Sequence, residues 1–403
     1  MSTGMPKKWK VDRFKRPEPA PLKFGADGKF KILHITDIHD VEPIMDDDEI
    51  REIPDNKDKE TINVIEKLVE KTNPDLVVFG GDNVSGYWEE FNYDYIQSTI
   101  QKITAPIRSR NIPLCVVFGN HDGELGFHTE FQMMQYMEYN NCRSNLNDAD
   151  VYGTGNCCVT IKSSKEDKDA FAIWLMDSND YDEKPGCDNG YDHVHEDQIA
   201  WYEKRSAELR EANGGEPLPA ILFQHMPVIQ EYDLMREAKP HEYFWSVPGY
   251  IGPLKDKRFV KKDGVEGYLG EGPCSPAIDK GQFASWKKVG DIKAAFFGHD
   301  HLNDFTGVVD DIILGQNKTS GFHAYTDGCK ATIRMVTINE DEPDKINTKI
   351  YHFKDLGLKS ESLDFIQRNF SDRTLINTNK IIGATLAVGG AIGIGALIKH
   401  FMG

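Results

Sequence analysis

The sequence of 403 residues predicts an α/β fold, and three observations carry this prediction. Short apolar runs with the β-branched content of buried strands recur along the chain, and most end in Gly, Asp, Asn or His. Between the first two runs, Phe30–Thr36 and Leu76–Phe79, residues Lys57–Thr72 have the apolar periodicity of an amphipathic helix. A strand, a helix and a strand in this order favour a right-handed crossover and parallel pairing. The length suits one large α/β domain or two smaller ones.

Composition and charge exclude some classes of partner. Apolar residues make up 39% of the chain and charged residues 28%, which is typical of globular proteins. The formal net charge of −18 argues against long nucleic acids, because phosphate backbones bind basic surfaces. A small phosphate ester held at metal ions remains compatible with this charge. Seven cysteines without a CxxC pair predict reduced thiols in the cytosol, and neither disulfides nor a zinc cage.

Residues 1–28 are predicted to form a basic arm ahead of the folded domain. Within residues 1–25, seven Lys and Arg residues accompany two acidic residues, Asp12 and Glu18. The arm contains no apolar run, so we expect no secretory signal and a protein that is not secreted. A solvated, disordered arm and a contact with an anionic surface are both compatible with this composition.

The first three strands present polar side chains at their carboxyl ends, where open α/β sheets build their sites. Asp37 and His39 point the same way because side chains alternate along a strand. An amide and an imidazole stand side by side at Asn120 and His121. The strands and the polar residues that follow them are Phe30–Thr36 with Asp37 and His39, Leu76–Phe79 with Asp82, and Leu114–Phe118 with Asn120 and His121.

Three later strands continue this pattern, and helices are predicted at Tyr95–Ile103 and Asp197–Arg210. Three last strands alternate more regularly, which predicts an antiparallel portion of the fold. The first set consists of Ala170–Met176, Ala220–Gln224 with His225, and Lys293–Phe297 with His299 and His301. The second set consists of Val308–Leu314, Thr332–Ile338 and Lys349–Phe353.

Four segments between these elements follow no regular pattern. The acidic run at 46–49 is interpreted as a solvated excursion, with extra cation binding as the alternative. The chain from His121 to about residue 155 resembles a peripheral insertion. His193 and His195 precede a helix and are interpreted as rim residues rather than ligands. Residues 231–283, rich in Gly, Pro, Lys and aromatics, are predicted to form a lid or substrate-facing loop region.

The C-terminal segment is apolar. A polar connector at 357–379 leads to a hydrophobic tail at 380–398, in which residues 381–398 carry no charge. Eighteen residues at a rise of 1.5 Å span about 27 Å, just within reach of a bilayer core. Gly389 and Gly393 have the spacing of closely packed membrane helices. We expect this tail to anchor the protein with its domain facing the cytosol, and a buried or frayed tail is the alternative.

The polar residues at the strand ends share one chemistry, because they offer carboxylate, amide and imidazole ligands and no thiolate. Such a set suits Fe, Mn or Zn. One carboxylate can bridge two ions about 3.5–4 Å apart, as in hydrolytic two-metal centres. The candidate site residues are Asp37, His39, Asp82, Asn120, His121, His225, His299 and His301.

The five motifs DIH, GGDN, GNHD, QHMP and GHDH, in this order, resemble those of the calcineurin-like metallophosphoesterases. They span residues 37–301, and the domain is expected to cover 29–356. Flanking segments are similar to the purple acid phosphatase 28/29-type subgroup. These segments are Tyr191–Trp201, Gly298–Phe305 and Gly321–Tyr325.

The resemblance implies a two-sheet β-sandwich flanked by helices and two metal ions drawn from Mn, Fe or Zn. It assigns His121 as the acid that protonates the leaving oxygen or steadies the transition state. It also implies that Asn120 and His121 contact the substrate. The implied ligands are Asp37, His39 and His301 for the first ion, Asn120, His225 and His299 for the second, and Asp82 as the bridge.

Two departures from related families are visible. Purple enzymes carry a Tyr where this chain has Ser85, and they lack a His at the position of His39, so we expect no purple colour. The phosphate-gripping Arg of the serine/threonine phosphatases is replaced by Gly86. The carboxylate partner of His121 is therefore open, with Asp122 as a partner or, in the favoured interpretation, as a brace for the loop.

The expected function is dinuclear metal-dependent hydrolysis of phosphoric esters by a metal-bridging hydroxide, with phosphomonoesterase activity first. The substrate is expected to be a small phosphate ester or a phosphoprotein. A phosphodiesterase acting on small diesters is the alternative, and a metal-binding scaffold without catalysis is a third hypothesis. The sequence gives no indication of the oligomeric state.

Overall fold

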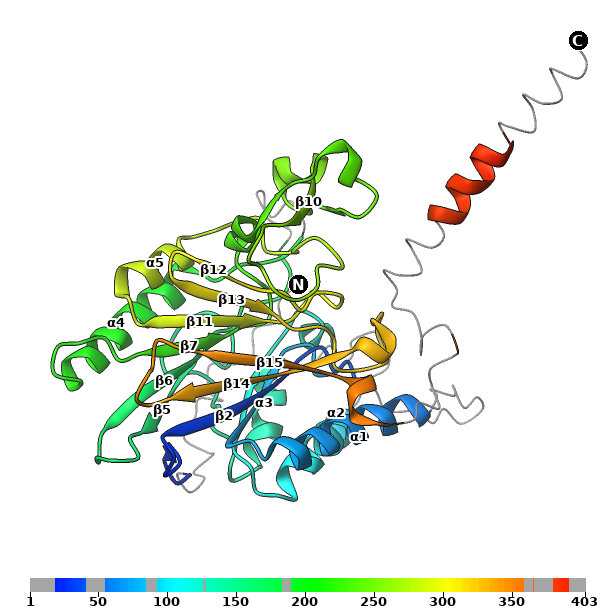
Figure 1. The fold of residues 1–403 in the computed structure, drawn as a ribbon. Coiled ribbons are helices and arrows are strands. Elements are labelled where there is room, and N and C mark those ends of the chain that lie inside the picture. The colour runs from blue at the N-terminus through cyan, green and yellow to red at the C-terminus, as the bar shows by residue number, and fades with distance from the viewer. Residues whose placement is uncertain are drawn as a thin grey trace, which may run out of the picture.

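The computed structural model describes residues 19–40, 55–84, 93–125, 128–182, 190–358, 365 and 380–390, and its strands form three sheets (Figure 1). The seven-stranded sheet has the order β1 (Leu22–Lys23), β5 (Cys157–Lys162), β6 (Asp169–Leu175), β7 (Ala220–Phe223), β11 (Ile292–Phe297), β13 (Ile312–Gln316) and β12 (Thr306–Val309). The five-stranded sheet has the order β15 (Asn347–His352), β14 (Thr332–Asn339), β2 (Lys29–Ile35), β3 (Leu76–Gly80) and β4 (Leu114–Val117). The three-stranded sheet has the order β8 (Met235–Glu237), β10 (Arg258–Lys261) and β9 (Val247–Pro248).

Helices cover the outer faces of the two large sheets. The α-helices are α1 (Asp55–Thr72), α2 (Tyr93–Arg108), α3 (Thr129–Met137), α4 (Glu196–Ala212) and α5 (Gln282–Val289), and residues 380–390 are also helical. Short 3-10 helices lie at η2 (Asp122–Leu125), η3 (Ile229–Leu234), η4 (Pro240–Glu242), η5 (Gly252–Asp256), η6 (Gly328–Lys330) and η7 (Phe353–Leu356). The helices expected at 57–72, 95–103 and 197–210 correspond to α1, α2 and α4, each of which is longer than predicted.

Three apolar clusters define four layers. One cluster lies between the two large sheets and includes Ile32 of β2 and Phe296 of β11. A second joins the five-stranded sheet to α1, α2 and α3, and a third joins the seven-stranded sheet to α4 and α5. Figure 1 shows the same arrangement, with α1 and α2 beside β2 and with α4 and α5 beside β7 and β11. The predicted two-sheet sandwich flanked by helices is confirmed.

The sandwich explains why its central strands are apolar on both faces. In β2, Ile32 faces the opposite sheet while its neighbour Leu33 packs against the helices, so neither face meets water. Strand β2 pairs in parallel with β3, and β3 with β4. On the other side of β2, β14 is antiparallel to both β2 and β15, which confirms the predicted antiparallel portion.

One predicted strand is wrong. Residues 308–314 are not a single strand but the middle of a hairpin, in which β12 is antiparallel to β13. The chain turns at Asp310 and Asp311, whose φ angles are 47° and 66°. Two consecutive positive φ angles are typical of a two-residue hairpin turn that matches strand twist. The apolar residues on both sides of the turn concealed it in the sequence.

Two irregular segments are more ordered than predicted. The chain between 121 and 155 is not peripheral, because α3 buries Met133 and Tyr136 against the five-stranded sheet. Residues 231–283 contain the small three-stranded sheet, which Figure 1 shows projecting beyond the sandwich. Non-local packing stabilises both segments, which is why periodicity did not predict them.

The described ends of the chain differ in their contacts. Leu22 of β1 lies within the predicted arm, yet β1 pairs in parallel with β5, and Leu22 and Phe24 are buried. At the other end, the helix at 380–390 is exposed along its whole length. Residues 391–398 of the predicted tail lie outside the described residues. Within the described part of the chain, none of the helices has the length and apolar content needed to cross a bilayer.

Candidate metal centre

The predicted ligands lie at the carboxyl ends of five strands that belong to both large sheets. Strands β2, β3 and β4 run in parallel in one sheet, and β7 and β11 run in parallel in the other. Parallel strands end at the same edge of a sheet, so the polar residues that follow them meet there. The sandwich places these two edges next to each other, since side chains from both sheets fall into common groups.

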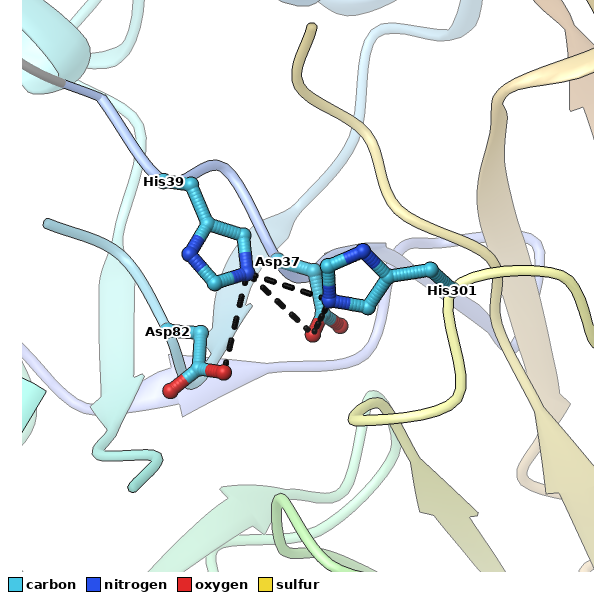
Figure 2. Close-up of side chains that lie close together, drawn as sticks. All are labelled: Asp37, His39, Asp82 and His301. Carbon is cyan, nitrogen blue, oxygen red and sulfur yellow. Dashed lines mark hydrogen bonds and ion pairs between the residues drawn. The ribbon is translucent and has the colours of Figure 1, made fainter. Parts of the chain in front are cut away.

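The first group combines Asp37, His39, Asp82 and His301, which are all buried and each have a ligand atom within 4.8 Å of the others. Figure 2 shows the two imidazole rings and the two carboxylates converging on one point. Nε2 of His301 lies 3.3 Å from Oδ1 of Asp37. Nε2 of His39 lies 3.1 Å from Nε2 of His301 and 3.6 Å from Oδ2 of Asp82.

The second group combines Asp82, His225 and His299 and shares Asp82 with the first. Nε2 of His225 lies 3.1 Å from Oδ2 of Asp82. Asn120 follows β4 on the neighbouring loop, and its buried Oδ1 accepts no hydrogen bond within the described part of the chain. The next residue, His121, donates its backbone N–H to Oδ1 of Asp82 at 2.8 Å. One carboxylate therefore lies between two sets of imidazole ligands.

Two of the imidazoles are held in the tautomer that a metal requires. Nδ1 of His225 lies 2.9 Å from the carbonyl oxygen of Gly80, and Nδ1 of His301 lies 2.7 Å from that of Tyr325. A carbonyl oxygen only accepts, so each Nδ1 carries a proton and Nε2 is the ring atom left to bind a metal ion. Histidine ligands in metalloproteins are usually oriented by such a hydrogen bond.

The electrostatics of the site favour bound cations. Burial lowers the pKa of His39 and of His299 to about 3, which keeps both rings neutral and able to act as ligands. Burial also acts to lower the pKa of His225, but the carboxylates of Asp82 and Asp37 raise it to about 10. The paired carboxylates thus attract positive charge to a buried position. Together with the unpaired Oδ1 of Asn120, this donor set fits two metal ions.

The backbone at the site is strained. Asp37, His39, Asp82 and His299 all have positive φ angles, between 47° and 73°. This region is uncommon for residues other than glycine, and such strain concentrates at functional sites. Two hydrogen bonds hold the turn after β2 in place, from the N–H of Asp37 to Gly81 O at 2.9 Å and from the N–H of His39 to Asp82 O at 2.8 Å.

Two motif glycines leave room for the ligands. A Cβ at Gly119 would lie 2.2 Å from Oδ1 of Asp82, and one at Gly298 would lie 2.0 Å from Oγ1 of Thr36 and 2.5 Å from Oδ2 of Asp37. Cβ atoms do not approach other atoms this closely, so any other residue would displace a carboxylate. The glycines in GNHD and GHDH are therefore explained by close packing rather than by backbone flexibility.

Asp122 braces the loops, which confirms the favoured interpretation. Its buried carboxylate accepts backbone N–H groups from Asn83 and Val84 on the loop after β3, both at 3.1 Å. It also accepts the N–H of Gly119 on the loop after β4, at 2.9 Å. Asp122 therefore fixes the loops that carry Asp82 and Asn120 relative to each other.

The carboxylate partner of His121 is Glu124, which was not among the predicted residues. Nδ1 of His121 lies 2.7 Å from Oε2 of Glu124, three residues along the chain. Tyr181, which follows β6, was missed as well. Its hydroxyl lies 2.7 Å from Oε1 of Glu124 and 2.7 Å from Nδ2 of Asn120. The three-residue spacing of His121 and Glu124 was a usable signal, whereas Tyr181 gave none.

His193 and His195 do not join the two groups of ligands. They lie with Asp192 in a separate cluster, where Nε2 of His195 is 3.0 Å from Oδ1 of Asp192. His195 is the N-cap residue of α4, and Tyr152 stacks on its ring at 3.9 Å. Ser85, where purple enzymes carry a Tyr, lies outside the described residues.

Comparison with known proteins agrees with this geometry. The sequence pattern described as "calcineurin-like phosphoesterase" matches residues 30–303. The chain belongs to the calcineurin-like phosphoesterase family.

Several relatives are similar along most of the chain. It is 29% identical to the "probable inactive purple acid phosphatase 14" of Arabidopsis thaliana over 342 residues. This match covers 80% of this chain and 78% of the relative. It is 26% identical over 337 residues to the "probable inactive purple acid phosphatase 29" of the same plant, covering 79% of each. It is also 26% identical over 295 residues to the "phosphatase DCR2" of Saccharomyces cerevisiae, covering 70% of this chain and 46% of the relative. The resemblance to the purple acid phosphatase 28/29-type subgroup is thereby confirmed.

Proposed function

We propose that this member of the family is a dinuclear metal-dependent phosphomonoesterase. The observation that carries the proposal is the position of Asp82, which belongs to both groups of ligand atoms. Two ions that share a carboxylate have the short separation used to hydrolyse phosphoric esters. Asp37, His39 and His301 would hold the first ion, Asn120, His225 and His299 the second, and Asp82 both. Mn, Fe and Zn all suit these ligands.

The protein's own residues supply the remaining chemistry. Two bound ions would supply an activated water at neutral pH and positive charge for the phosphate oxygens. Asn120 would orient the phosphoryl group beside its ion. The ring of His121 lies 5.1 Å from that of His39, at the edge of the first ligand group. Glu124 holds the proton on Nδ1 of His121, so that Nε2 can carry a proton to the leaving oxygen.

A substitution of His121 tests this assignment. We expect His121→Asn to retain the metal content of the wild type and to lose turnover by about 10²–10⁴-fold, the usual contribution of a general acid. Metal content is measured by elemental analysis and turnover with p-nitrophenyl phosphate. Wild-type turnover in the variant would remove His121 from the mechanism.

The reaction class is tested by comparing p-nitrophenyl phosphate with bis-p-nitrophenyl phosphate. Metal-stripped protein is refilled separately with Mn, Fe or Zn before each assay. Monoester hydrolysis restored by one of these metals would support the proposal and identify the cofactor. Preference for the diester would instead indicate a phosphodiesterase. Two bound ions without hydrolysis of either ester would contradict the proposal for these substrates and favour the scaffold hypothesis.

A further inference from the structure

A chain of hydrogen bonds joins Asn120 to His121 through two residues that belong to neither ligand group. Nδ2 of Asn120 donates to the hydroxyl of Tyr181 at 2.7 Å. That hydroxyl donates to Oε1 of Glu124 at 2.7 Å. The other oxygen of Glu124, Oε2, lies 2.7 Å from Nδ1 of His121. The path starts and ends on adjacent residues of the loop after β4.

The direction of each donor in this chain is determined. Both oxygens of Glu124 accept in this network, one from the O–H of Tyr181 and the other from Nδ1–H of His121. Because the hydroxyl of Tyr181 uses its only proton in this way, it must accept from its other neighbour. Asn120 must therefore turn its NH₂ group toward Tyr181. Its carbonyl Oδ1, which has no hydrogen bond within the described residues, is left for a metal ion.

Tyr181 is 43% exposed, and a backbone bridge and a ring contact position it. Its backbone forms an antiparallel bridge with Tyr191, and the two rings stack with centroids 5.5 Å apart. The ring of Tyr191 in turn meets that of His299 edge-on at 4.8 Å. The phenol thus reaches the loop after β4 from the opposite sheet. Tyr181 is 61 residues from Asn120 in the sequence, so tertiary structure alone brings them together.

We propose that Tyr181 and Glu124 are positioning residues that set the amide of Asn120 and the ring tautomer of His121 at the same time. This inference rests on the proposed function, since it assigns Asn120 to an ion and His121 to the leaving oxygen. Tyr181 acts through Asn120 on metal affinity. Glu124 acts through His121 on proton delivery.

The role of Tyr181 is tested by titrating Zn²⁺ into metal-stripped protein and following the heat of binding. The wild type is expected to bind two ions, and Tyr181→Phe to bind one of them about 10–100-fold more weakly, the usual effect of losing a residue that orients a ligand. Tyr351→Phe is the matched control, because it removes a phenol hydroxyl from β15, away from the site. Two ions bound with wild-type affinity by Tyr181→Phe would overturn the inference.

A second pair of variants tests whether Tyr181 acts through Asn120. If it does, adding Tyr181→Phe to Asn120→Ala weakens Zn²⁺ binding no further, because the amide to be oriented is already gone. A further loss of 10-fold or more in the double variant would show that Tyr181 acts by another route and would overturn the assignment.

The role of Glu124 is tested with Glu124→Gln, which keeps one acceptor oxygen where two donors need one each. We expect kcat for phenyl phosphate, a poor leaving group, to fall about 10–100-fold, and kcat for p-nitrophenyl phosphate to fall less, with similar KM values. Only a poor leaving group depends strongly on a delivered proton. An equal loss for both substrates would indicate a structural role and overturn the proposal for Glu124.

These experiments separate the inference from the proposed function. Zn²⁺ affinity is measured without turnover. If the wild type hydrolyses no ester but Tyr181→Phe loses affinity, the proposed function fails and the positioning role of Tyr181 stands. If the wild type is a phosphatase and its variants behave as it does, the proposed function stands and the inference fails.

Discussion

The brace formed by Asp122 allows a quantitative prediction for Asp122→Ala. The buried carboxyl group accepts three backbone N–H groups, from Asn83, Val84 and Gly119. Leaving a buried donor unsatisfied costs about 1–3 kcal/mol, so the gross loss is about 3–9 kcal/mol. Alanine cannot make the hydrogen bonds that connect the loops after β3 and β4. We therefore expect weaker Zn²⁺ binding as well as lower stability.

Part of this loss is offset, because burying the carboxyl group of Asp122 itself lowers the stability of the wild type. Burial raises the pKa of Asp122 to about 7. The unfolded chain ionises near its ordinary value, so the folded state loses stability as the pH rises from about 4 to 7. By pH 5 the wild type has lost about 1.5 kcal/mol of stability in this way, and the substitution removes this penalty. The expected net loss at pH 5 is therefore at least about 1.5 kcal/mol.

The assay is the urea midpoint of unfolding at pH 5, measured without metal. Asp27→Ala is the matched control, because Asp27 accepts a single exposed N–H group, from Lys29 at 3.1 Å. We expect the control to change stability by less than about 0.5 kcal/mol. Equal midpoints for Asp122→Ala and Asp27→Ala would refute the brace.

Three further predictions concern stability, the metal ligands and the tail. Burial raises the pKa of Glu231 to about 8, so the wild type loses stability as the pH rises from about 4.5 to 8. Glu231→Gln should become more stable relative to the wild type by about 1.4 kcal/mol per pH unit in that range, and urea midpoints at pH 5 and 8 that move in parallel would contradict this. Gly298→Ala should reduce Zn²⁺ binding by at least about 10-fold, because its Cβ would lie 2.0 Å from Oγ1 of Thr36, and wild-type affinity in a Zn²⁺ titration would contradict the steric argument. For the tail at 380–398 we propose membrane anchoring toward the cytosol. Truncation after residue 379 should move the protein from the membrane pellet to the supernatant, and full-length protein that stays in the supernatant without detergent would refute it.

The sequence by itself predicted the candidate ligand set. Each motif is local, because the ligand follows a buried strand directly, and in GGDN, GNHD and GHDH a glycine lies between the strand and the ligand, as in Gly119-Asn120. Coordination chemistry restricts the residue types at these positions, and parallel strands bring their ends to one edge. The sequence therefore predicted the residues that the structure gathers around Asp82, and the layered fold that gathers them.

Tertiary structure decided the features that depend on contacts between distant segments. The burial of α3, the hairpin turn at Asp310 and the small third sheet had no periodic signal of their own. The same is true of the partners of the site. Whether Asp122 or Glu124 faces His121 depends on how a short 3-10 turn directs two carboxylates, and Tyr181 reaches Asn120 only because two sheets pack face to face. Strand patterns record which faces are buried, whereas a single hydrogen bond across the sandwich leaves no periodic trace in the chain.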